Sequence, residues 1–193
     1  MNVTPAIRSM SGGITKIPTS LSGAFILEPP VFRDERGFFF ESYNQRIMAE
    51  AGIVDNFVQD NHSCSSRNVL RGLHYQVKHP QGKLVRVVEG EILDVAVDLR
   101  RSSSTFGRWE SVRLSGENNR TFWIPVGFAH GFLALSEKAH VLYKATDFYA
   151  PEYERTLAWN DPQVNIEWPM NGEPIVSAKD QQGVRLADAE TFE

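Results

Sequence analysis

The chain has 193 residues, of which 41% are hydrophobic, and this length and composition are typical of one globular domain with a substantial core. Its 20 basic and 24 acidic residues leave a formal net charge of −4, which provides no general attraction to nucleic acid or to an anionic membrane. Cys64 is the only cysteine, which excludes an intramolecular disulfide. Any basic binding site must therefore be local.

The first 22 residues mix small and polar residues without a continuous apolar run, so they match neither a signal peptide nor a membrane span. We expect residues 1–22 to form a flexible N-terminal extension, because they have little with which to offset their ordering entropy. Residues 23–193 are then a single domain with a C-terminal tail. The expected location is the cytoplasm.

From Gly23 onward, short β-forming runs alternate with Gly, Pro, Asn and Ser turns, which predicts an all-β fold. Residues 44–51 predict a short helix, in which Asn44 caps the start and Gly52 closes the end in a left-handed conformation. The number and spacing of the strands favour a jelly-roll barrel. The predicted strands are 24–28, 38–42, 57–62, 69–76, 83–89, 92–99, 109–114, 121–124, 132–135 and 141–148.

The run 92–99 predicts the clearest strand, because its odd-numbered positions are all Leu or Val and share one face. The even-numbered face is mixed and carries Asp94. In a small barrel this face can point into a polar cavity and make Asp94 a pocket residue; a solvated outer face is the alternative. After Pro151 the pattern loosens, with at most one short helix near 151–156, and its rigid prolines favour a tail that wraps the barrel.

The stretches 70–76 and 125–130 resemble the two histidine-bearing strands of a cupin barrel. Metal-binding cupins carry His-x-His in the first stretch, whereas here Gln76 follows His74. His130 and Glu89 are the remaining nearby ligand candidates, and His79 lies in a Pro-Gln-Gly turn. Because so few dispersed ligands make a weak site, we predict a pocket without metal or cofactor, in which His74 exchanges protons. The alternative for a lone histidine is a hydrogen-bonded core residue.

A catalytic imidazole works best beside a carboxylate that fixes its tautomer, and Asp94, Asp161 and Asp180 are the candidates for this partner. Spacing alone does not choose among the three. Tyr143 and Tyr149 are six residues apart, which places both on one face of a strand. One phenol can serve as an acid and the other as a stacking platform, or both can belong to an aromatic core.

Four cations adjoin glycines or acidic residues, namely Arg36, Arg71, Lys83 and Lys179. If they converge, they form an anion pocket suited to a diphosphate, and the alternative is solvated surface. Arg71 and His74 fall on opposite faces of an ideal strand. A bulge or bend at Gly72 would bring them to the same side.

Five segments together resemble the dTDP-4-dehydrorhamnose 3,5-epimerase family, namely 34–42, 57–63, 70–76, 81–86 and 124–132. The resemblance extends from about residue 25 to residue 180. It implies a cupin-type jelly roll that works as a homodimer without metal or cofactor. It also implies inversion of C3 and C5 of dTDP-4-keto-6-deoxyglucose, giving dTDP-4-keto-L-rhamnose.

The same resemblance implies roles for individual residues. His74 would be the base, Tyr143 the acid on the opposite sugar face, and Lys83 a cation near the C4 oxygen. The Ser-x-Lys-Asp motif at 177–180 would make Asp180 the partner of His74. Tyr149 would stack on thymine. The residues implied to hold the rest of the nucleotide sugar are Arg36, Glu41, Gln59, Asp60, Asn61, Arg71, His130, Glu154 and Lys179.

Three other functions remain open at this point. A related enzyme that inverts C3 alone would keep both His74 and Tyr143. A non-catalytic cupin that binds a nucleotide sugar would not need the acid and base pair. A metal-dependent cupin oxygenase is disfavoured by Gln76.

Overall fold

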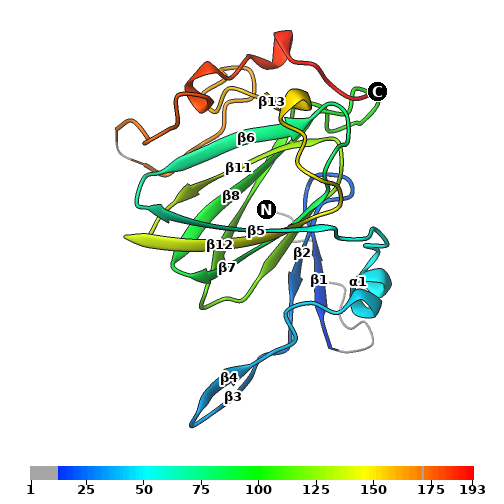
Figure 1. Cartoon of the computed structure of the whole chain (residues 1–193), viewed down its shortest axis with the longest axis vertical. Helices are drawn as coiled ribbons and strands as arrows, with labels where there is room; N and C mark the ends of the chain where they lie inside the picture. Colours follow the sequence, from blue (N-terminus) through cyan, green and yellow to red (C-terminus); the bar gives the residue numbers. More distant parts are fainter. Residues whose placement is uncertain (1–12, 171) are drawn as a thin grey trace.

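The computed structural model describes residues 13–170 and 172–193, which form two facing antiparallel sheets (Figure 1). In spatial order, the six-stranded sheet contains β1 (Thr15–Pro18), β2 (Phe25–Glu28), β10 (Thr121–Ile124), β7 (Lys83–Glu89), β12 (Lys138–Ala145) and β5 (Gln59–Ser66). The five-stranded sheet contains β13 (Glu154–Thr156), β6 (Leu70–Gln76), β11 (Phe128–Ala134), β8 (Glu91–Asp98) and β9 (Trp109–Ser115). The predicted all-β, cupin-type jelly roll is confirmed, although the two sheets are not closed into a barrel.

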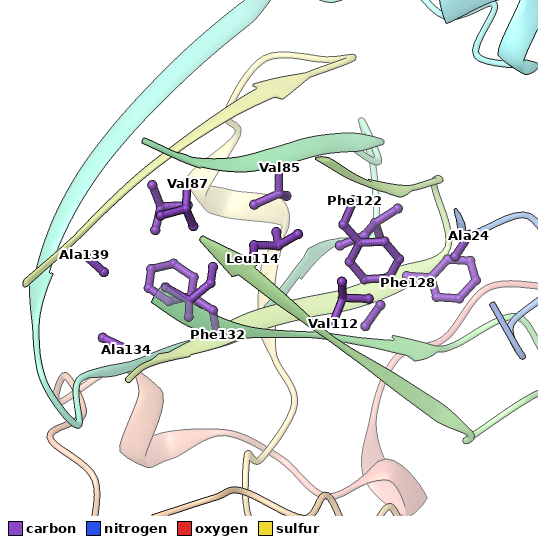
Figure 2. Packing of buried hydrophobic residues seen from close by; sticks show 14 of the residues in the cluster. Ala24, Val85, Val87, Val112, Leu114, Phe122, Phe128, Phe132, Ala134 and Ala139 are labelled. Carbon is purple, nitrogen blue, oxygen red and sulfur yellow. The ribbon is translucent and has the colours of Figure 1, made fainter. Parts of the chain in front are cut away.

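The main core lies between the two sheets and is built from alternate residues of the strands on both sides. Figure 2 shows Val85 and Val87 of β7 above Phe132 of β11, with Phe122 and Phe128 packed farther along the same layer. These side chains are all at most 5% exposed. The core fixes the spacing of the sheets, so polar side chains on the same inward faces border a rigid cavity.

Strand β8 is buried on both faces. Its odd-numbered face packs against the C-terminal tail, which supplies Leu157, Val164 and Leu186. Its even-numbered face points between the sheets and makes Asp94 fully buried. The tail therefore covers the five-stranded sheet, as predicted, and runs across the top of Figure 1. It includes the 3-10 helices Pro151–Tyr153, Asp180–Gln182 and Leu186–Asp188.

The helix α1 (Gln45–Ala51) packs on the outer face of the six-stranded sheet through Met48 and Ala51. The Asn44 side chain accepts hydrogen bonds from the backbone N–H groups of Arg46 and Ile47, and Gly52 ends the helix with φ of 98°. Both predicted caps are confirmed. Their determinants are local, which is why the sequence indicated them.

The amino-terminal boundary differs from the prediction. Thr15–Pro18 form β1 and pair with β2, and Ile14 and Leu21 are buried. These two apolar side chains and the free edge of β2 hold the segment in the fold, so the expected extension does not reach residue 22. Residues 1–12, the rest of that predicted extension, lie outside the described residues.

The predicted strand 38–42 is also different. Among the described residues, strands β3 (Phe32–Asp34) and β4 (Gly37–Phe39) pair only with each other, and they project away from the two sheets (Figure 1). A tight turn ending at Gly37, with φ of 127°, returns the chain on itself before it can join either sheet.

Within the described residues, no helix is long and apolar enough to cross a membrane.

Candidate active site

His74 on β6 is hydrogen-bonded to a buried carboxylate from the C-terminal tail. The distance from His74 Nε2 to Asp180 Oδ1 is 2.6 Å, and the Gly72 N–H donates to the other carboxylate oxygen at 3.3 Å. The Ser177 hydroxyl accepts a hydrogen bond from the Asp180 N–H at 3.1 Å. Burial alone would raise the pKa of Asp180, but the hydrogen bonds and charge of His74 lower it below its ordinary value. Asp180 is therefore a charged, fixed acceptor for the ring.

Gly72 explains how β6 presents this histidine. A Cβ atom at Gly72 would lie 2.7 Å from both the Gly131 Cα and the His130 carbonyl oxygen, so a larger residue would push β6 away from β11. The register between these strands shifts here, with His74 opposite His130 and Arg71 opposite Phe132. The predicted irregularity at Gly72 is present, and Arg71 and His74 border the same cavity.

A second imidazole–carboxylate pair lies beside the first. His130 Nε2 is 2.8 Å from Oδ1 of the fully buried Asp94. Burial lowers the pKa of His130 although Asp94 opposes this shift. Asp161 instead accepts hydrogen bonds from the backbone N–H groups of Gln163 and Leu186, at 2.6 and 2.5 Å. Of the three candidate carboxylates, Asp180 thus contacts His74, Asp94 contacts His130 and Asp161 orders the tail.

Tyr143 and Lys83 approach from the other sheet, on β12 and β7. Burial raises the pKa of the Tyr143 phenol, and the nearby Glu154 charge adds to this increase. Lys83 is 9% exposed, and burial lowers its pKa to about 8 despite the opposing charges of Glu154 and Asp94. The site therefore combines a lysine that titrates near neutral pH with a phenol that stays protonated.

Two adjoining cavities of about 260 and 550 Å³ share His74, Lys83, Tyr143, Tyr149 and Glu154 in their walls. Volumes of this size suit a small-molecule ligand. Seven of the residues assigned to nucleotide-sugar binding border one cavity or both, namely Gln59, Asn61, Arg71, His130, Tyr149, Glu154 and Lys179.

Tyr149 reaches the cavity in a way that strand spacing did not predict. Strand β12 ends at Ala145, so Tyr149 lies on the following loop and not on the strand face of Tyr143. Its hydroxyl donates a hydrogen bond to Glu154 at 2.7 Å, which raises the pKa of Tyr149 to about 12. Lys179 Nζ lies 2.5 Å from the same Glu154 carboxylate. The prediction of a shared cavity holds, but the tertiary placement of a loop produces it.

Three predicted binding residues do not border these cavities. Arg36 is exposed on the β3–β4 hairpin and pairs with Asp34, and Glu41 is exposed just after β4. Asp60 points to the outer face of β5, where it pairs with Lys144 at 2.9 Å. The expected convergence of four cations thus includes Arg71, Lys83 and Lys179 but not Arg36.

The other candidate metal ligands are dispersed. His79 pairs with Asp147 at 3.3 Å, and Glu89 lies 3.8 Å from His140 on the outer side of the sheet. Across residues 13–170 and 172–193, no three His, Cys, Asp or Glu side chains are arranged to hold a metal ion. Gln81 borders the smaller cavity and Ser177 the larger one, and neither was predicted as a site residue. Ser177 is the first residue of the Ser-x-Lys-Asp motif, so the motif itself held the signal for it.

Comparison with known proteins identifies the family. The family model for dTDP-4-dehydrorhamnose 3,5-epimerase matches residues 18–188. A Pseudomonas aeruginosa protein of that name is 60% identical over 174 residues, which cover 90% of this chain and 96% of that protein. The corresponding Methanothermobacter thermautotrophicus protein is 57% identical over 167 residues, covering 86% of this chain and 90% of that protein.

Solved structures give the same result. The Legionella pneumophila dTDP-6-deoxy-D-glucose-3,5-epimerase, in complex with dTDP-4-keto-L-rhamnose, has a TM-score of 0.89 and 50% identity, covering 92% of this chain and 95% of that one. A 3'-monoepimerase from Streptomyces bikiniensis, in complex with dTDP-quinovose, has a TM-score of 0.83 and 35% identity, with coverages of 89% and 87%. The chain belongs to the dTDP-4-dehydrorhamnose 3,5-epimerase family.

Proposed function

We propose that this chain inverts C3 and C5 of dTDP-4-keto-6-deoxyglucose and releases dTDP-4-keto-L-rhamnose. One observation carries the proposal. His74, which the tail residue Asp180 holds, lies on the five-stranded sheet, whereas Tyr143 lies on the facing sheet. His74 and Tyr143 border the same cavities. Inversion requires a proton to leave one face of the sugar and to return to the other, and groups on facing sheets meet that requirement.

The chemistry begins with the C4 ketone, which acidifies the hydrogens on C3 and C5. A carboxylate only accepts hydrogen bonds, so Asp180 holds the proton of His74 on Nε2 and leaves Nδ1 free to act as the base. The Lys83 ammonium stabilises the negative charge that develops on the C4 oxygen. Tyr143 then donates a proton to the opposite face. His74 then gives its proton to solvent and the Tyr143 phenolate takes one up, which restores both groups. The same two transfers at the second carbon complete the double inversion.

The nucleotide would be held by the remaining cavity residues. Arg71 and Lys179 offer charge for the diphosphate, and Gln59, Asn61 and His130 offer hydrogen bonds. Tyr149 is 52% exposed, which leaves a ring face available to stack on thymine. Glu154 links Tyr149 to Lys179, so the base and phosphate regions of the pocket are coupled.

A homodimer would give Arg36 and Glu41 a place in this scheme. Both lie in or just after the β3–β4 hairpin, which projects from its own subunit and exposes Phe32, Phe38 and Phe39 (Figure 1). Such a hairpin can reach the cavity of a second copy while burying its phenylalanines against that copy. Sedimentation should therefore give a dimer. Sedimentation as a monomer at the concentrations of the activity assay would contradict this part of the proposal.

Turnover of dTDP-4-keto-6-deoxyglucose in deuterated water tests the function directly. We expect one solvent deuterium at C3 and one at C5 of the product, measured by NMR and mass spectrometry. Deuterium at C3 alone would show that the chain is a C3 epimerase and would contradict the double inversion. Binding of dTDP without exchange at either carbon would favour a nucleotide-sugar-binding protein and overturn the proposal.

A further inference from the structure

We propose that Gln76 is a positioning residue, which holds the loop of Tyr149 so that the tyrosine ring is already placed for the nucleobase. This inference rests on the function proposed above, in which Tyr149 stacks on thymine. Gln76 is the last residue of β6 and is 3% exposed. It also occupies the position at which metal-binding cupins carry their second histidine.

The Gln76 side chain uses its whole amide group on two loops. Its Nε2 donates to the carbonyl oxygens of His79, at 2.6 Å, and Phe148, at 3.2 Å. Its Oε1 accepts a hydrogen bond from the Ala150 N–H at 2.9 Å. The residues on both sides of Tyr149 are therefore bound to one buried side chain.

Tyr149 is held at two further points. Its backbone N–H donates to Gln59 Oε1 at 2.8 Å, and its hydroxyl donates to Glu154 at 2.7 Å. Glu154 is the residue of β13 that pairs with Gln76 in the β6–β13 ladder. The backbone of Tyr149 and the tip of its ring are thus both connected to the end of β6.

This arrangement matters because the two aromatic side chains of the loop, Phe148 and Tyr149, are 64% and 52% exposed, so apolar burial does little to hold the loop. An exposed ring that must become ordered on binding loses entropy, and this loss weakens the affinity for the ligand. The hydrogen bonds of Gln76 order the loop before the ligand arrives. We therefore assign Gln76 to nucleotide affinity and not to the proton transfers.

The geometry also explains why this position carries glutamine. The two carbonyl groups and the N–H group require two donated hydrogen bonds and one accepted hydrogen bond. A primary amide supplies all three, whereas a neutral imidazole has a single donor and an ionised carboxylate has none. Histidine at residue 76 would leave part of the loop without its partners.

A double-mutant cycle tests the proposal. Gln76→Met and Gln76→Glu are made in the wild-type chain and in a Tyr149→Ala background, and the Kd for dTDP is measured by calorimetry. In the wild-type background we expect Kd for dTDP and KM for the keto sugar to rise about tenfold, which corresponds to about 1.4 kcal/mol. We expect kcat to change by less than about threefold. In the Tyr149→Ala background, the Gln76 variants should cause no further loss, because the ring that they position is absent.

Gln163→Met is the matched control. Gln163 is exposed and lies on the tail away from the cavities. Its substitution should therefore leave Kd, KM and kcat unchanged. Circular dichroism checks folding of both Gln76 variants. If Gln76→Met does not fold, the cycle uses Gln76→Glu alone, which retains the acceptor for Ala150. An equal loss in both backgrounds, or a fall in kcat with unchanged dTDP affinity, would overturn the proposal. The cycle measures binding, so its result is separate from the deuterium test of epimerisation.

Discussion

Replacing Lys83 with methionine is expected to stabilise the fold near neutral pH while removing most of the turnover. Burial lowers the pKa of Lys83 from 10.5 to about 8, so the folded state holds the charged form at a cost. At about 1.4 kcal/mol for each pH unit, this difference corresponds to about 3 kcal/mol of lost stability when Lys83 is charged. Methionine fills a similar volume without the charge and should recover up to that amount.

The gain should depend on pH with a definite sign. Below about pH 8 the folded and unfolded states both hold the Lys83 proton, and the cost to the wild-type chain is complete. Between about pH 8 and 10.5 the unfolded state binds more protons than the folded state, so wild-type stability rises with pH. The advantage of Lys83→Met should therefore shrink over that range. Wild-type turnover should fall over the same range, because the charged ammonium is the form that stabilises the enolate.

Urea unfolding at a fixed protein concentration, at pH 6.5 and pH 9.5, measures the free energies of unfolding. Lys138→Met is the control, since Lys138 is exposed at the start of β12, and it should change stability by less than about 0.5 kcal/mol at either pH. Turnover of Lys83→Met should fall by roughly 10²- to 10³-fold. A variant that is less stable than wild type at pH 6.5, or an advantage that persists unchanged at pH 9.5, would refute the reasoning.

Three further predictions concern the dyad, the acid and the helix cap. Asp180→Asn removes the charged acceptor that fixes the His74 tautomer, so kcat should fall by roughly 10²- to 10⁴-fold. Calorimetry should find that the variant still binds dTDP. Turnover equal to that of the wild type would show that the 2.6 Å contact has no catalytic role. Tyr143→Phe should keep dTDP affinity and lower product formation over a similar range, with product measured by NMR, and full turnover would exclude Tyr143 as the acid. Asn44→Ala removes the two hydrogen bonds that begin α1, so it should lower the free energy of unfolding by about 1 kcal/mol and leave kcat unchanged. Gln45→Ala, at the next residue, is the control. An equal loss of unfolding free energy in both variants would argue against the cap.

Local patterns in the sequence were sufficient for much of the fold. The Asn44 side chain caps α1 through backbone groups within three residues of it, and Gly52 ends the helix through its own left-handed backbone. Alternation along 92–99 marked a strand whose two faces differ. Such determinants act within a few residues, so they can be recognised before any tertiary contact is known. The long motifs around His74 and His130 likewise carried the resemblance to the family.

Long-range packing decided what those patterns left open. The residues alone offered three carboxylates for His74, and the resemblance selected Asp180, which lies 106 positions away in the sequence. Its contact depends on the tail that covers the five-stranded sheet and on the close approach of β6 and β11 at Gly72. Asp94 was equally acceptable by spacing, but the inward face of β8 brings it to His130.

The sequence by itself therefore determined the all-β class, the capped helix and the inventory of acid, base and cationic groups, because each follows from neighbouring residues or from a continuous motif. Only the tertiary structure decided that Tyr149 enters the cavity from a loop, that Arg36 lies on a hairpin that projects away from the two sheets, and that Gln76 bonds to the Tyr149 loop. These outcomes depend on which distant segments pack together. Strand periodicity carries no information about that choice, since it describes only the two faces of a single strand.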